Sequence, residues 1–301
     1  MWVLGCIKSA SLFYAYLSHM DKETAIIIGI AILIGIVLLR KVFTKKKLVQ
    51  EKLNQPFPDL WRETLAKKVF FYSQLNDADK KLFEKRIQLF IATKTIEGID
   101  TEIDDDIRLM VASGAIIPTF AFPEYNYPNV KVVLIYPNSF DEEFQTQRFE
   151  GHREYITGMV GNRFQNGTVI LSKPDLIMAF DGLPHKSNVG VHEFVHLLDK
   201  EDGVIDGIPE SLMEHKFVGP WLHEIKNEMR KIETGKSDIN PYALTNNAEF
   251  LAVVSEYFFD SPEKFQHRHP ELYQYLAAIF NKDKSKQHDI EDISEAKTPT
   301  A

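Results

Sequence analysis

The stretch 189-VGVHEFVHLLDKEDG-203 contains two histidines, His192 and His196, four residues apart in an otherwise apolar segment. On a helix this spacing places both imidazoles on one face, roughly 6 Å apart, where they can bind one metal ion. Zn²⁺ accepts imidazole nitrogens, and a catalytic zinc site has three protein ligands and a water. Glu193 directly follows the first histidine, where it can take a proton from that water. The H-E-x-x-H pattern therefore predicts a zinc ion held by His192 and His196, with Glu193 as general base.

The alternative is a pair of buried histidines that are hydrogen-bonded without a metal. Val191, Phe194 and Val195 surround the motif with apolar side chains, which indicates a buried helix. Polar groups within such a helix need partners. A metal would satisfy both imidazoles and place the glutamate beside its water, so the metal site is the favoured interpretation.

The motif does not identify the third ligand. In the longer pattern H-E-x-x-H-x-x-G-x-x-H, Asp199 stands here at the glycine position and Asp202 at the last ligand position, which makes Asp202 a weak candidate. The other architecture takes a glutamate from a second helix. The apolar segment 248–259 offers Glu249 and Glu256, seven residues apart and therefore on one helix face. The chemistry favours Glu249 over Glu256 only slightly.

Outside the motif, hydrophobic periodicity predicts a mainly helical α+β domain with a small sheet. Asn76 and Asp77 precede an amphipathic segment, and Ser187–Asn188 precede the motif, as is typical of helix starts. An extended substrate could pair with the strand at 166–172 if that strand lies at the edge of the cleft. His267 and His269 are expected to be exposed. The predicted helices are two segments between 56 and 96, then 104–117, 220–233, 248–259 and 271–280, and the predicted strands are 130–137 and 166–172.

An apolar run near the N-terminus, AIIIGIAILIGIVLL at residues 25–39, carries no charge. These residues alone reach about 22 Å as a helix, so flanking residues must help to span a hydrocarbon core of roughly 30 Å. We therefore predict a single transmembrane helix over residues 24–43, within an N-terminal segment of residues 1–43. The alternatives are a buried core helix and a cleaved signal. The chain should continue with a basic juxtamembrane linker at 44–55, the main domain at 56–280 and a disordered polar tail at 281–301.

The charges that flank the apolar run predict its orientation. Asp21 and Glu23 precede the run, whereas Arg40, Lys41 and the lysines at 45–47 follow it. Positive charge marks the cytoplasmic side of a membrane helix. The sequence therefore predicts a single-pass protein of a bacterial inner (cytoplasmic) membrane, with the main domain facing the cytoplasm. Translation could begin at Met1 or at Met20.

Composition excludes several other classes of protein. The formal net charge is −8, and because the N-terminal segment is basic, the main domain is more acidic still. An acidic domain does not attract a phosphate backbone, so a nucleic-acid partner is not expected. Cys6 is the single cysteine, which excludes an intrachain disulfide and a cysteine-based metal site.

Several segments resemble, in order, the MtfA family of zinc peptidases (Mlc titration factor A-like). The motif region VGVHEFVHLLDKEDGVIDGIP is followed by PYAL and by NNAEFLAVVSEYFFDSP. Upstream, the segments FPDLWRETLAKKVFFYSQL, LFEKRIQLFIATKTIEG, VKVVLIYPNSF and NGTVILS also look like family segments. The resemblance covers residues 56–280 and leaves out the N-terminal anchor, so it implies nothing about regulation by that segment.

The resemblance implies a zincin-like metallopeptidase domain in which Glu249 joins His192 and His196 as the third zinc ligand. Glu193 is then general base and acid. Tyr242 stands where the family has a tyrosine near the site, suited to donate a hydrogen bond to an oxyanion, although a packed turn tyrosine is the alternative. Asp199, Asp206 and Glu256 are candidates for carboxylates that accept the free imidazole N–H of a ligand and fix its tautomer.

The function expected from these observations is zinc-dependent hydrolysis of a peptide or protein substrate. The family name also suggests a repressor-type protein partner. The alternative is a membrane-anchored, non-catalytic zinc protein that sequesters a regulatory partner, which a complete H-E-x-x-H argues against because a structural zinc site needs no Glu193. A metallohydrolase with a non-peptide substrate is a third possibility.

Overall fold

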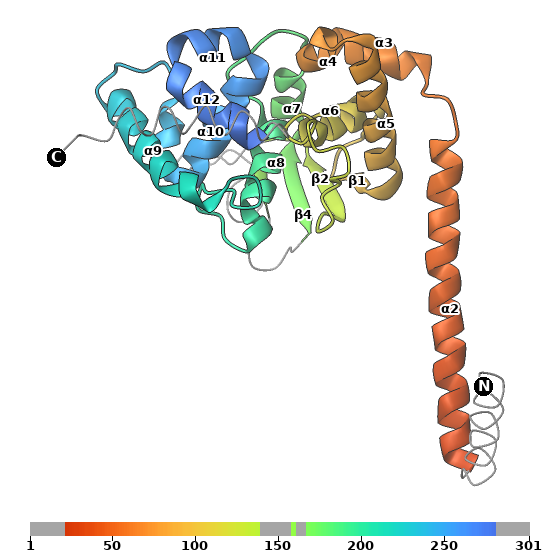
Figure 1. Ribbon diagram of the computed structural model, residues 1–301. Helices are drawn as coiled ribbons and strands as arrows, with labels where there is room; N and C mark the ends of the chain where they lie inside the picture. Colours follow the sequence, from red (N-terminus) through yellow and green to blue (C-terminus); the bar gives the residue numbers. More distant parts are fainter. Residues whose placement is uncertain (1–21, 139–157, 161–166, 281–301) are drawn as a thin grey trace, which may run out of the picture. The chain divides into compact units, whose positions relative to one another are not determined.

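The computed structural model describes residues 22–138, 158–160 and 167–280 (Figure 1). The chain divides into two compact units, Met1–Gln55 and Pro56–Ala301. We describe each unit by itself. The predicted tail at 281–301 lies outside the described residues.

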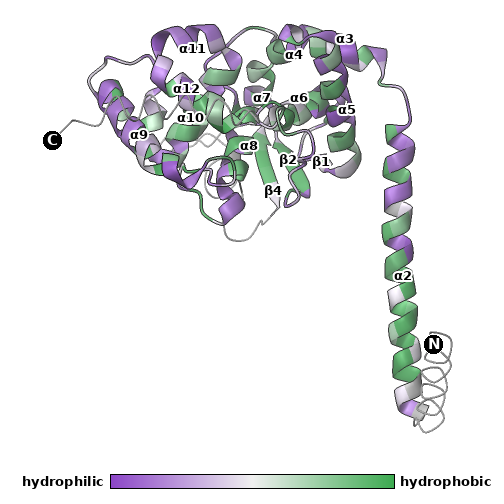
Figure 2. Cartoon of the chain, in the orientation of Figure 1, coloured by the Kyte–Doolittle hydropathy of each residue, from purple (hydrophilic) through white to green (hydrophobic). Residues whose placement is uncertain are grey.

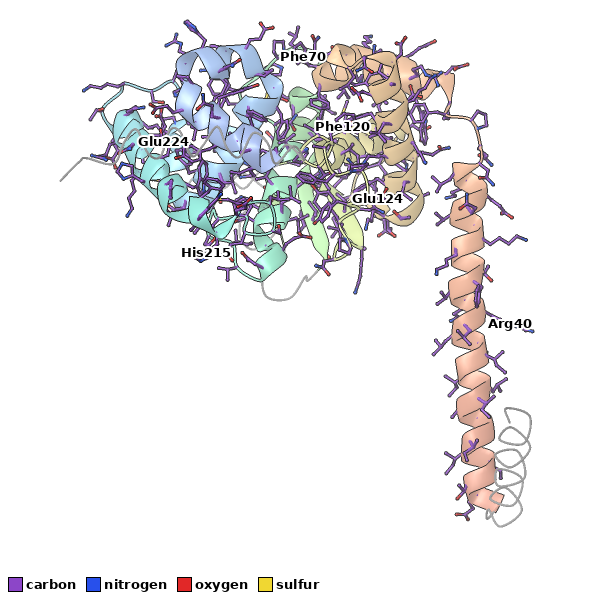
Figure 3. All side chains as sticks on the ribbon, in the orientation of Figure 1. Arg40, Phe70, Phe120, Glu124, His215 and Glu224 are labelled. Carbon is purple, nitrogen blue, oxygen red and sulfur yellow. The ribbon has the colours of Figure 1, made fainter. Side chains whose placement is uncertain are left out.

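The first unit contains one long helix, α2 (Lys22–Leu53). Within the described ranges, Ile26–Leu53 of this helix is the one segment long and apolar enough to cross a membrane. Its apolar and polar parts follow one another along the axis (Figure 2), and the Arg40 side chain extends outward from the helix (Figure 3). The helix continues through residues 44–53, which the sequence analysis places in a linker, because the lysine, leucine, glutamine and glutamate residues there are strong helix formers.

The second unit is built on a small sheet of four strands in the order β1-β2-β4-β3. β1 (Thr95–Gly98), β2 (Val132–Tyr136) and β4 (Thr168–Ser172) are parallel, and β3 (Gly158–Val160) is antiparallel to β4. β2 and β4 confirm the two predicted strands. The proposed substrate pairing along β4 is wrong, because β4 lies inside the sheet between β2 and β3.

Helices make up most of the second unit, so the predicted mainly helical α+β fold is confirmed. Figure 1 shows α3 to α6 grouped on one side of α8 and α9 to α12 on the other. Figure 3 shows side chains filling the space between these groups. The helices are α3 (Asp59–Lys68), α4 (Phe70–Gln74), α5 (Asp77–Thr93), α6 (Asp105–Ile116), α7 (Lys173–Ala179), α8 (Val189–Asp199), α9 (Val218–Glu233), α10 (Asn247–Asp260), α11 (Pro262–Arg268) and α12 (Pro270–Phe280), with 3-10 turns η1 (Lys200–Asp202), η2 (His215–Phe217) and η3 (Pro241–Leu244).

Side-chain caps explain where four of these helices begin. Asn76 accepts hydrogen bonds from the backbone N–H groups of Ala78 and Asp79, which confirms the predicted start of α5. Asn188 accepts from the N–H of Val191 and so fixes the start of α8, as predicted. Asp104 and Asn246 cap α6 and α10 in the same way. Each cap satisfies a backbone donor that the first turn leaves unpaired.

The motif helix α8 is held at the centre of the core. Its Gly190 touches Gly114 of α6 so closely that a Cβ on Gly114 would lie 2.8 Å from the Gly190 backbone. One turn further on, the centre of the Phe194 ring lies 5.7 Å from the ring centre of Phe90 and 4.9 Å from that of Tyr127. These apolar contacts bury one face of α8 and leave the face with the two histidines directed toward α10.

A buried ion network surrounds His269, between α11 and α12. Its Nδ1 lies 2.8 Å from Oε1 of Glu228, and its Nε2 lies 2.8 Å from Oδ1 of Asp238. Lys186 and Tyr257 donate to the other oxygen of Asp238, at 2.7 and 3.0 Å. The expectation that His269 is exposed is therefore wrong, because the turn before α12 places its imidazole between two carboxylates.

This network should make stability depend on pH. Burial alone would lower the pKa of His269, but hydrogen bonds to Glu228 and Asp238 raise it above the ordinary value. The charged imidazole then stabilises the fold fully below about pH 6.5, and this contribution is lost as pH rises through the folded-state pKa. We expect His269→Leu to reduce the free energy of unfolding by about 3–5 kcal/mol near pH 6, and by less at pH 9, in chemical denaturation.

The neighbouring His267 is exposed and provides a matched control. His267→Leu should leave the free energy of unfolding nearly unchanged at both pH values. A destabilisation by His269→Leu that is constant or larger at pH 9 would contradict the role of the protonated imidazole.

Candidate metal centre

Two packed helices, α8 and α10, bring three potential metal ligands together. Nε2 of His192 lies 3.1 Å from Nε2 of His196 and 3.0 Å from Oε2 of Glu249. Nε2 of His196 lies 3.4 Å from the same carboxylate oxygen. Among the residues that the structure describes, these three form the one cluster of histidine, cysteine and acidic side chains able to hold a metal ion.

The separations fit a tetrahedral ion. Ligand atoms that each lie roughly 2.0–2.1 Å from a tetrahedral zinc ion are about 3.3 Å from one another. Without a metal, the contact between the two Nε2 atoms is a hydrogen bond when one ring carries its proton there, and a metal ion would take the place of that proton. The donor set of two imidazoles and one carboxylate suits zinc, and it leaves a fourth position for water.

Glu193 follows His192 on α8, and its side chain is 4% exposed. Burial raises the pKa of this carboxyl above its ordinary value, although the neighbouring imidazoles act against that rise. A raised pKa suits a carboxylate that must accept a proton near neutral pH and release it again. Glu193 is therefore a buried carboxyl with a raised pKa, next to His192 in the chain.

Glu256 contacts the opposite side of the His192 ring from Glu249. Its Oε1 lies 2.6 Å from Nδ1 of His192, and its Oε2 accepts a hydrogen bond from the backbone N–H of Asn188. A carboxylate on Nδ1 fixes the proton there and leaves the Nε2 lone pair free for a metal. The geometry thus distinguishes the two glutamates: Glu249 faces Nε2 of His192 in the candidate ligand cluster, and Glu256 contacts Nδ1 of the same ring.

Asp260 is connected to Glu256 through Asn188 and was not among the residues predicted from the sequence. The side-chain amide of Asn188 donates to its Oδ2 at 3.3 Å. Burial, with a smaller effect from the charge of Glu256, raises the pKa of Asp260 well above its ordinary value. The available signal was one more acidic residue, four positions after Glu256, at the end of an apolar helix.

The other aspartates near the motif serve the turns that follow α8. Oδ2 of Asp199 accepts the backbone N–H of Gly207 at 2.8 Å. Asp202 and Asp206 each accept the backbone N–H two residues further on, from Val204 and Ile208. Neither Asp202 nor Asp206 belongs to the ligand cluster formed by the described residues.

Tyr242 lies beside the cluster, on η3. Its ring centre is 6.2 Å from that of His192, and 52% of the residue is exposed. Asn240 accepts the backbone N–H of Tyr242 and so defines the turn that carries the ring. The ring of Tyr242 is therefore half-exposed and lies beside that of His192.

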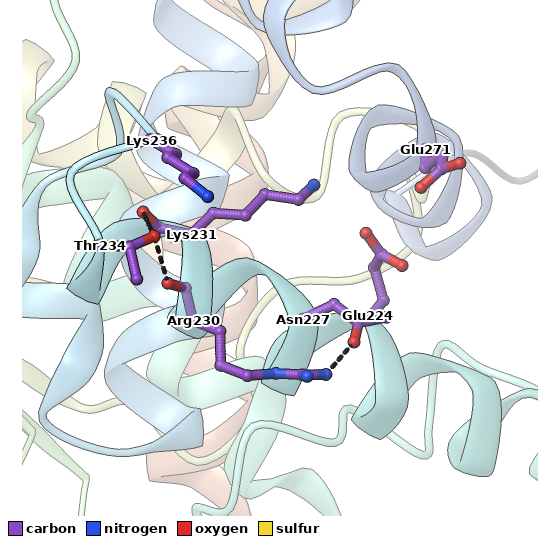
Figure 4. A pocket seen from close by; sticks show the side chains of 7 residues that line it. All are labelled: Glu224, Asn227, Arg230, Lys231, Thr234, Lys236 and Glu271. Carbon is purple, nitrogen blue, oxygen red and sulfur yellow. Dashed lines mark hydrogen bonds between the residues drawn. The ribbon is translucent and has the colours of Figure 1, made fainter.

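A shallow hollow on α9 and α12 lies apart from these ligands (Figure 4). Glu224 and Glu271 act electrostatically on Lys231, which also donates to Glu228 at 2.7 Å. Arg230 donates to the side chain of Asn227. The residues that line the hollow include no histidine or cysteine.

Comparison with known proteins relates the chain to metallopeptidases. A model of the family described as glucose-regulated metallo-peptidase M90 matches residues 42–281. An uncharacterized protein of Synechocystis is 30% identical over 240 residues, covering 77% of this chain and 86% of that protein. Mlc titration factor A of Cronobacter sakazakii is 35% identical over 239 residues, covering 76% and 87%. Mlc titration factor A of Salmonella agona is 34% identical over 165 residues, covering 52% and 60%.

Proposed function

Since the chain belongs to the glucose-regulated metallopeptidase family M90, we propose that it is a zinc-dependent peptidase that hydrolyses peptide bonds in a peptide or protein substrate. The observation that carries this proposal is the meeting of His192, His196 and Glu249, whose ligand atoms all lie within 4.8 Å of one another. The buried Glu193 on the same helix adds the base that a structural zinc site would not need.

Each side chain of the site has a separate role in the proposed reaction. Zinc, when bound, supplies an acidic water and polarises the scissile carbonyl. Glu193 accepts the proton of the attacking water and returns it to the leaving amine. Glu256 holds the proton on Nδ1 of His192 and keeps the ring in its orientation. Tyr242 donates its phenol hydrogen to the oxygen of the carbonyl as charge develops there.

The same site would be presented at a membrane. The apolar part of α2 would form the anchor, and the positive charges that follow it favour an orientation with the peptidase unit on the cytoplasmic side of a bacterial inner membrane. Substrates are then proteins or peptides that reach the inner face of that membrane.

A second candidate function is sequestration of a regulatory protein. The relatives named Mlc titration factor A carry a name that refers to another protein, which favours a repressor-type partner. In this proposal zinc holds α8 and α10 together, and the surface around Tyr242 is available for binding. The two candidate functions differ in one observable: only the peptidase cleaves what it binds.

The test uses the full chain in detergent micelles, with metal analysis and a broad library of quenched fluorescent peptides. We expect one zinc per chain, cleavage that a chelator abolishes, and recovery of cleavage when zinc is added back. A chain that binds one zinc and cleaves no peptide would favour sequestration. A chain that binds no zinc would overturn both functions.

A further inference from the structure

The two ligand histidines differ in how their other ring nitrogen is satisfied. His192 has its Nδ1 bound by Glu256, whereas Nδ1 of His196 is buried without a hydrogen-bond partner in the described part of the chain. A buried ring nitrogen without a partner is destabilising, because it has lost its hydrogen bond to water. Because a histidine that binds a metal through Nε2 must carry its proton on Nδ1, that proton needs an acceptor.

One turn further along α8, Asp199 has the complementary deficiency. Asp199 is 1% exposed, and its Oδ2 accepts the backbone N–H of Gly207. The other oxygen, Oδ1, is buried and has no partner within the described ranges. Burial, with the charge of Asp206, raises the pKa of Asp199 to about 6, and hydrogen bonds from the backbone N–H groups of Gly207 and Ile208 and the charge of His196 act in the opposite direction.

Helix geometry brings these two groups toward each other. Residues three apart are neighbours on a helix surface, and side chains lean toward the helix N-terminus. We therefore expect the carboxylate of Asp199 to lie over the turn that carries His196. We propose that Asp199 is a positioning residue for the metal centre: its Oδ1 accepts the Nδ1–H of His196, directly or through one water, when the metal is bound. This inference rests on the proposed zinc site.

The same carboxylate connects the ligand to the loop after α8. Gly207, held by Oδ2 of Asp199, has a φ of 81°, and a Cβ there would lie 2.3 Å from the carbonyl oxygen of Asn247. Asn247 opens α10, two residues before Glu249. The carbonyl of Gly207 accepts the indole N–H of Trp221 at 2.7 Å. Asp199 thus joins His196 to the turn that packs against the start of the helix carrying Glu249.

Asp199→Asn separates positioning from folding. The amide oxygen can still accept the N–H of Gly207, but the amide NH₂ then faces the imidazole N–H, so one of the two hydrogen bonds is lost in either orientation. We expect zinc affinity to fall about 10–100-fold, measured by chelator competition on the full chain in detergent. The unfolding temperature of the zinc-free protein should stay close to that of the wild type.

Asp202→Asn is the matched control, because that exposed aspartate also caps a turn but faces no ligand. Its zinc affinity should equal that of the wild type. Unchanged affinity in Asp199→Asn, or a loss explained entirely by a lower unfolding temperature of the zinc-free protein, would overturn the proposal. A wild type without zinc would instead overturn the proposed function itself.

A second measurement does not depend on how the variant folds. In the zinc-loaded wild type labelled with ¹⁵N-histidine, the Nδ1 proton of His196 should exchange slowly with solvent, as should that of His192 on Glu256. Slow exchange at His192 with fast exchange at His196 would show that His196 has no acceptor, and the positioning role of Asp199 would be wrong.

Discussion

Replacing Glu193 with glutamine should reduce peptide hydrolysis by about 10²–10⁴-fold while zinc remains bound. The amide has nearly the same size and shape as the carboxylate, so the buried position beside His192 is kept. It cannot accept a proton from the attacking water or return one to the leaving amine. The fall should therefore appear in kcat, with little change in KM.

The measurement is kcat on a cleaved library peptide, together with zinc content and unfolding temperature. Glu210→Gln is the matched control, since it makes the same change at an exposed residue near the end of the loop that follows α8. That variant should keep wild-type kcat. Hydrolysis by a zinc-loaded Glu193→Gln protein at the wild-type rate would assign the proton transfer to another group and remove Glu193 from the mechanism.

Local signals were sufficient for much of the fold. The H-E-x-x-H motif lies on a buried helix, and Asn76 and Asn188 cap the helices that they were expected to begin. The two longer apolar strands were also found. These features depend on hydrophobic periodicity or on a few neighbouring residues, which a sequence displays directly.

Features set by distant contacts were not predictable in the same way. β1 and β3 are too short to show a clear hydrophobic alternation in the sequence. They form strands because they pair with β2 and β4. His269 follows polar residues that suggest exposure. Its burial depends on two distant carboxylates, Glu228 of α9 and Asp238 of the loop before η3, which enclose its imidazole. The first helix continues through the predicted linker, because the residues there are strong helix formers although their charge suggested a break.

The two glutamates of α10 show the limit most clearly. Glu249 and Glu256 share a helix face, and nothing in their spacing tells which of them lies on the Nε2 side of His192. The crossing of α10 over α8 decides it, because it places Glu249 at 3.0 Å from Nε2 and Glu256 at 2.6 Å from Nδ1. Sequence chemistry alone therefore gives the set of acidic residues, and packing assigns their roles.

This assignment predicts unequal losses of zinc when either glutamate becomes glutamine. Glu249→Gln removes a charged ligand, so zinc affinity should fall by more than about 100-fold, beyond the range for a residue that only orients a ligand. Glu256→Gln leaves three ligands in place and should weaken zinc about 10–100-fold. Both affinities are measured by chelator competition on the full chain.

The two variants control for each other, because they make the same change on the same helix and both residues contact His192. Without metal both glutamates contact His192, so both variants should lose some zinc-free stability. Hydrogen bonds from both histidines hold the pKa of Glu249 below its ordinary value although burial alone would raise it, so without metal Glu249 still forms favourable contacts that glutamine weakens. If Glu256→Gln instead released zinc while Glu249→Gln retained it, Glu256 would be the ligand, and α10 would have to turn relative to α8 when the metal binds.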